Sequence, residues 1–136
     1  MCFRELGDVW YCGIVQWGIG VIATWLGDFE KARASFRECL RGSWSFGNRW
    51  ALAYPLEAFA ALAVEEGQYP RAARLLGAAE ALRAEFGVVM ETSDHPTLRK
   101  IFARAAEEFI KPEMVVARKE GRNLTAAEAM KFALEG

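Results

Sequence analysis

The sequence is poor in the residues from which most catalytic and metal sites are built. It has one histidine, His95, and three cysteines, Cys2, Cys12 and Cys39, without a Cys-x-x-Cys spacing. An odd number of widely spaced cysteines speaks against a disulfide framework or a zinc site, and free thiols are typical of a reducing compartment. We therefore expect a cytoplasmic protein that binds no metal and no other cofactor.

Sequence motifs for catalysis or for nucleic-acid binding are also missing. There is no GxxxxGK[ST] phosphate-binding loop and no nucleophile-elbow sequence around the serines. Basic and acidic residues nearly balance, 17 against 18, whereas nucleic-acid-binding domains usually show a basic excess on one face. His95 has few candidate partners, so we read it as a residue at the start of a helix. These absences predict a protein that is not an enzyme, has no catalytic residues and does not bind nucleic acid directly.

One long uncharged segment, 9–27, needs a membrane check. Its length would allow a marginal transmembrane helix. However, it contains Gln16 and Thr24, its glycines are dispersed at helix-packing spacings, and no positive cluster flanks it. We expect a helix that is buried in protein and has no contact with a membrane.

Prolines number only four and runs of β-branched residues are scarce, while 53% of the residues are hydrophobic. This composition predicts an all-α fold, and the length of 136 residues fits a single domain over 1–136. The stretch 71–87 illustrates the pattern, because small apolar residues recur at helical spacing between Pro70 and Gly87, which suit a helix start and a helix stop.

The sequence contains an internal repeat. The segment 27–36 matches 67–76 at an offset of 40 residues, with a glycine, an aromatic, an alanine and a bulky apolar residue in the same places. Each unit predicts a helix, a tight turn and a second helix. We expect two hairpins, 8–42 and 49–86, followed by C-terminal cap helices within 96–135.

The expected helices of these units have identifiable ends. They cover about 8–25, 29–42, 49–66, 70–86, 96–109 and 112–120, with a last helix opened by a capping box at Thr125. Pro55 should kink the third helix or delay its start, and Gly121 should end the sixth.

The hairpin residues resemble the tetratricopeptide repeat, in which a small residue on the first helix meets an Ala-x-x-x-Phe pattern on the second. Gly20, Ala32 and Phe36 match this pattern, whereas Gln16 and Leu56 stand where the repeat usually has tryptophan. The resemblance implies a tetratricopeptide-like α-α superhelix of about seven helices with a C-terminal helical cap, although the period is longer than the usual ~34 residues.

A second resemblance covers most of the chain. The string RAARLLGAAEALR at 71–83, and Glu-Gly-Arg at 120–122 followed by a capped helix at 125–134, look like the C-terminal part of bacterial LuxR-type or antibiotic-regulator-type proteins. In that family an ATPase module of the STAND class precedes helical repeats. The resemblance implies a protein-interaction or signal-sensing module of a transcriptional regulator. A free-standing adaptor or small-molecule sensor is the alternative.

Aromatic residues suggest where a partner binds. In this repeat type the first helix of each hairpin lines a concave surface, and apolar grooves edged by aromatics commonly hold a peptide or a helix. The opposing interpretation is that Trp17 and Trp25 pack against a preceding repeat or lie in the core, since large aromatics are mostly buried. The residues predicted to line a partner-binding groove are Trp17, Val21, Trp25, Trp50, Tyr54 and Glu57.

The first expected helix is apolar nearly all round, which makes it a poor end cap for a repeat array. The last helix, with Glu128, Lys131 and Glu135, is a better one. We therefore expect isolated copies to form a homodimer through the first helix and the groove.

Overall fold

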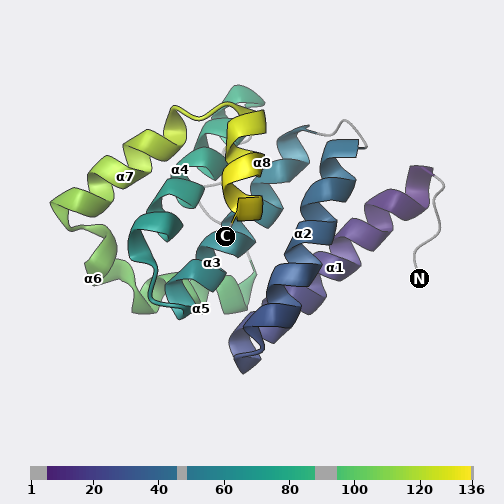
Figure 1. The fold of residues 1–136 in the computed structure, drawn as a ribbon, viewed down its shortest axis with the longest axis horizontal. Coiled ribbons are helices and arrows are strands. Elements are labelled where there is room, and N and C mark those ends of the chain that lie inside the picture. The colour runs from purple at the N-terminus through teal and green to yellow at the C-terminus, as the bar shows by residue number, and fades with distance from the viewer. Residues whose placement is uncertain (1–5, 46–48, 88–94, 136) are drawn as a thin grey trace.

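The computed structural model describes residues 6–45, 49–87 and 95–135, and every regular element in these ranges is helical (Figure 1). The all-α prediction is therefore confirmed. The elements of the described ranges are α1 (Leu6–Leu26), α2 (Phe29–Ser45), the 3-10 turn η1 (Arg49–Leu52), α3 (Ala53–Glu65), α4 (Tyr69–Glu85), α5 (Pro96–Arg104), α6 (Ala106–Phe109), α7 (Pro112–Arg122) and α8 (Ala126–Glu135).

Two helical hairpins, α1–α2 and α3–α4, turn in the same way. Gly27 and Gly67 have φ angles of +85° and +76°, which glycine adopts without strain. The amide of Asp28 donates to the Ala23 carbonyl at 2.9 Å, and the amide of Gln68 donates to the Ala63 carbonyl at 2.8 Å. These residues lie at the offset of 40 found in the sequence, so the repeat corresponds to a repeated turn.

Phe36 joins the two hairpins. Its ring lies directly against Gly20, where an added Cβ would overlap the ring, so α1 and α2 approach closely at this point. The same ring makes an edge contact with Phe59 on α3, with ring centroids 5.5 Å apart. Phe36 thus packs α2 against α1 at Gly20 and against α3 at Phe59.

Helix α3 lies at the centre of the molecule and begins late. The predicted start at residue 49 is a 3-10 turn, and regular α-helix starts at Ala53, which places Pro55 in the first turn where its missing N–H costs no hydrogen bond. Of the two effects predicted for Pro55, a kink or a late start, the structure shows the late start.

The C-terminal helices correct two predictions. The single helix expected over 96–109 is interrupted at Ala105, and the chain continues as the short helix α6. At the interruption the Ala105 amide donates to the carbonyl of Phe102, three residues earlier, at 3.1 Å. Gly121 does not end its helix. It lies inside α7 and is buried against the backbone of Arg74, as Gly77 is buried against the backbone of Arg118.

Helices α4 and α7 pack backbone against backbone, because Gly77 of α4 and Gly121 of α7 each face the backbone of the other helix. Ala73 packs with Met114 and Ala117 near the start of both helices, and further along both Glu80 accepts hydrogen bonds from the guanidinium groups of Arg118 and Arg122. The two helices therefore run in the same direction. By contrast, α2 and α3 run antiparallel. The repeated helix–turn–helix pattern therefore does not continue beyond α4.

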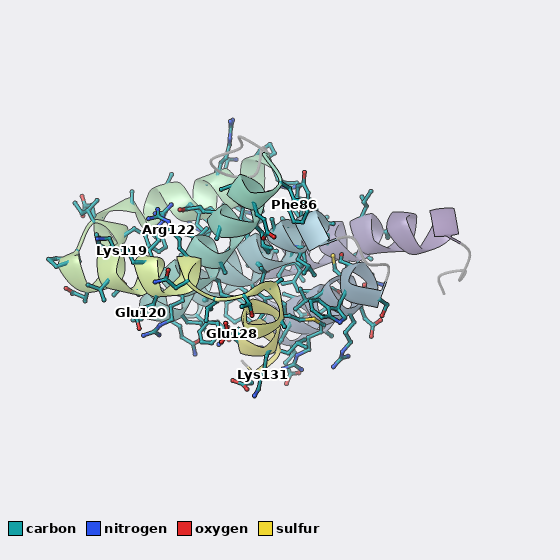
Figure 2. All side chains as sticks on the ribbon, turned by 90° about the horizontal axis from the view of Figure 1, so that it is seen from above. Phe86, Lys119, Glu120, Arg122, Glu128 and Lys131 are labelled. Carbon is teal, nitrogen blue, oxygen red and sulfur yellow. The ribbon has the colours of Figure 1, made fainter. Side chains whose placement is uncertain are left out.

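Helix α8 is fixed at both ends. The predicted capping box is confirmed, since the Thr125 amide donates to Glu128 Oε1 at 2.9 Å and the Glu128 amide donates to Thr125 Oγ1 at 3.1 Å. At the other end Arg71 of α4 donates to the carbonyls of Phe132 and Ala133, both at 3.0 Å. Figure 2 shows Glu128 and Lys131 on the outside of this helix.

Replacement of Gly77 by alanine should destabilise the protein, because the new Cβ would overlap the Arg118 carbonyl oxygen and the backbones would have to separate. We expect the free energy of unfolding, measured by urea titration, to fall by about 1–3 kcal/mol. Gly13→Ala is the control, since nothing lies within 4 Å of that position and alanine favours a helix interior. Equal stability of Gly77→Ala and the unmodified chain would contradict the close-contact interpretation.

Candidate interaction surface

The predicted groove is filled by the chain itself. Trp17 is half-buried, its Nε1 donates to the Tyr54 carbonyl at 3.2 Å, and its ring meets the His95 ring edge-on with centroids 5.2 Å apart. His95 caps the start of α5, as expected of a helix-start residue, and accepts from the Thr97 amide at 3.2 Å.

Helix α5 occupies the surface that α1 and α3 were predicted to leave open. Two of its own side chains, Leu98 and Ile101, are completely buried. Trp25 is half-exposed at the edge, with the Arg104 guanidinium carbon 5.0 Å from its ring centroid. Arg104 also pairs with Glu65 of α3 at 2.6 Å, so it holds α5 to both hairpins. An external peptide would have to displace α5 to reach this surface.

Two predicted groove residues lie in the core. Val21 and Glu57 have no exposed surface, because α5, α2 and α4 pack around the first helices of the hairpins. Placing them on an accessible groove was wrong. Tyr54 is half-buried beside them, and the side chain of Trp50 lies outside the described residues.

Glu57 instead forms a buried ion pair with Arg83. Arg83 Nη1 donates to Glu57 Oε2 at 2.6 Å, and both side chains are almost fully buried. The guanidinium carbon also lies 5.8 Å from the Tyr54 ring centroid, while Nη2 has no hydrogen-bond partner within the described part of the chain. With its carboxylate engaged by arginine and closed off from solvent, Glu57 fixes the position of α3 against α4.

Six of the ten exposed large hydrophobic side chains in the described ranges lie on α1, which was expected to be buried. Thr24 and Val21 do face the core, but the opposite side is open to solvent along much of the helix. We call this side the outer face of α1 and define it by the exposed side chains at three- and four-residue spacing, Val15, Ile19, Ile22 and Leu26, with Ile14 and Trp25 beside them.

A smaller apolar patch lies at the other end of the molecule. Ile110, directly after α6, and Val115 and Val116 on α7 are exposed. Figure 2 shows the charged side chains of Lys119, Glu120 and Arg122 on the same helix, far from α1. Charges therefore interrupt this patch, whereas the outer face of α1 has none from Val9 to Gly27.

Neither metal clusters nor membrane spans are found in the described residues. No group of three or more histidine, cysteine, aspartate or glutamate side chains among them is arranged to hold a metal ion. Of the helices in 6–45, 49–87 and 95–135, none is long and apolar enough to cross a bilayer.

Searches against protein-family models, curated proteins and solved structures found no match to this chain.

The Glu57–Arg83 pair should be costly to break from one side. Arg83→Met removes the guanidinium that balances the charge of a buried carboxylate, and we expect the free energy of unfolding to fall by about 3–5 kcal/mol in urea titrations. The double variant Glu57→Leu/Arg83→Met removes both charges and should recover part of that loss. A double variant as unstable as Arg83→Met would mean that packing, not charge, dominates here.

The Cys39 thiol should be inert in the folded protein. Burial raises its pKa to about 12, so at pH 8 it stays protonated and closed to reagents. In a chain with Cys2 and Cys12 replaced by alanine, we expect a thiol reagent to label Cys39 only across the urea unfolding transition. Rapid stoichiometric labelling in native buffer would show that α2 is not packed as described.

Proposed function

We propose that this chain is a non-enzymatic protein-interaction module that binds a partner helix on the outer face of α1. The observation that carries the proposal is the uninterrupted row Val15, Ile19, Ile22 and Leu26, exposed to solvent on one side of a long helix. Contiguous apolar surface of this kind marks interaction sites, because leaving it in water is unfavourable.

A helix is the partner that this row suits best. Its three- and four-residue spacing makes a straight apolar stripe along α1, and such stripes pack against the apolar stripe of a second helix. The concave surface is not proposed as the binding site, since α5 already lies across it and its residues Val21 and Glu57 are buried.

The wider setting of the module is also a proposal. The repeated turns at Gly27 and Gly67 and the Gly20–Phe36 contact support a tetratricopeptide-like arrangement of the hairpins. The resemblance of 71–83 and 120–134 to bacterial regulators supports a role in signal sensing by a transcriptional regulator in the cytoplasm. Partner binding would then be the event that the regulator senses.

Light scattering across a range of protein concentrations tests the proposal. Without a partner, the outer face of α1 should pair with that of another copy, so the apparent mass should rise with concentration. Ile22→Glu should remain monomeric, because association would bury an unpaired carboxylate and weaken by at least about tenfold. Ile22 is 58% exposed, so the unfolding midpoint should not change.

Val116→Glu is the matched control. Val116 is 57% exposed but lies on α7, so this variant should associate like the unmodified chain. A monomer at every concentration, or equal loss of association in both variants, would contradict a role for the outer face of α1.

A further inference from the structure

The outer face of α1 has a buried counterpart within the same molecule. At the offset of 40, Ile19 corresponds to Phe59 and Ile22 to Leu62 on α3. Ile19 and Ile22 are 37% and 58% exposed, whereas Phe59 and Leu62 are 3% and 2% exposed. The two faces occupy the same place in their hairpins and differ in being covered, so what covers α3 indicates what would cover α1.

Helix α2 packs along this face of α3, and α8 also contacts α3. Phe36 contacts Phe59, and Arg33 donates to Glu66 Oε2 at 2.6 Å, so α2 runs antiparallel to α3. Arg33, Phe59, Leu62 and Glu66 also line one shallow hollow at this seam. A phenylalanine and an arginine three residues apart therefore set the register between the two helices.

A second copy of the chain is not equipped to cover α1 in the same way. The helix equivalent to α2 in the second hairpin is α4, and its residues Ala73, Gly77 and Glu80 correspond to Arg33, Arg37 and Leu40. That face of α4 is already occupied by α7, through close backbone contact and the Glu80 ion pairs. Figure 1 shows α7 and α1 on opposite sides of the molecule.

We infer that the outer face of α1 binds an amphipathic helix of the α2 type, supplied by a partner and running antiparallel to α1. Position 26 is leucine where the second hairpin has Glu66, directly after the end of α3. The partner helix should therefore carry a bulky apolar residue against Ile19, as α2 carries Phe36, and an apolar residue in place of Arg33. This inference rests on the proposed function and adds the chemistry and the register of its partner.

Two peptides and two chains test the register. The peptides are labelled copies of residues 28–45, one unmodified and one with Arg33→Leu. The chains are the unmodified protein and Leu26→Glu, a change at a side chain that is 74% exposed. Fluorescence anisotropy measures the affinity of each of the four combinations, and Ile22→Glu serves as the chain that should bind neither peptide.

Crossed preferences are the expected result. The unmodified chain should prefer the Arg33→Leu peptide, and Leu26→Glu should prefer the unmodified peptide, because that combination recreates the Arg33–Glu66 pair. Both side chains of that pair are 22% exposed, so each matched combination should bind about two- to fivefold more tightly than its mismatch. Non-specific adhesion would instead be weakened by Leu26→Glu with both peptides.

Binding of neither peptide, or the same preference in both chains, would overturn the inference. So would a chain that associates through α1 but whose association neither peptide displaces, since the occupant would then be a second copy. That last result would leave the proposed interaction role of α1 intact. The proposed function itself fails in a different experiment, if Ile22→Glu self-associates as strongly as the unmodified chain.

Discussion

The arrangement of the molecule depends on the burial of α3. Of its 13 residues, 11 are buried, among them five alanines that let neighbouring backbones come close. A helix that is apolar all round is stable in water only when other elements cover every side of it. Here α1, α2, α4, α5 and α8 all contact it, and the buried Glu57–Arg83 pair fixes one of those contacts.

The two hairpins are closed unequally. The second is sealed by α7, which reaches the backbone of α4 through Gly77 and Gly121 and presents charged side chains to solvent. In the first hairpin, α1 packs against α2 on one side, and its outer face is exposed to water. Repeat arrays need polar ends, so an apolar end is the expected position for another helix. The proposed function follows from this difference between the ends.

Much of the fold was predictable from local signals. Gly27 and Gly67 supply a left-handed conformation, Pro55 delays a helix, and Thr125 with Glu128 forms a capping box; each acts within a few residues of itself. The errors involve contacts between distant segments. Gly121 was read as a helix end, but its missing Cβ serves contact with Arg74, and nothing adjacent in the sequence indicates that.

The candidate site was predicted only in part, for the same reason. Self-association through α1 stays a prediction, whereas Val21 and Glu57 are buried because α5, which comes from a distant part of the sequence, docks across the predicted groove beside Trp17. Comparing the exposure of Ile19 and Ile22 with that of Phe59 and Leu62 required both the repeat and the structure.

Native-state hydrogen exchange on the monomeric chain tests most directly the claim that α1 lacks a neighbour that α3 has. We expect amides of α3 to exchange only through global unfolding, while amides of α1 from Gly13 to Leu26 exchange through smaller openings with lower free energies. Equal protection of the two helices in a verified monomer would contradict it, because the outer face of α1 would then not be an unfilled packing position.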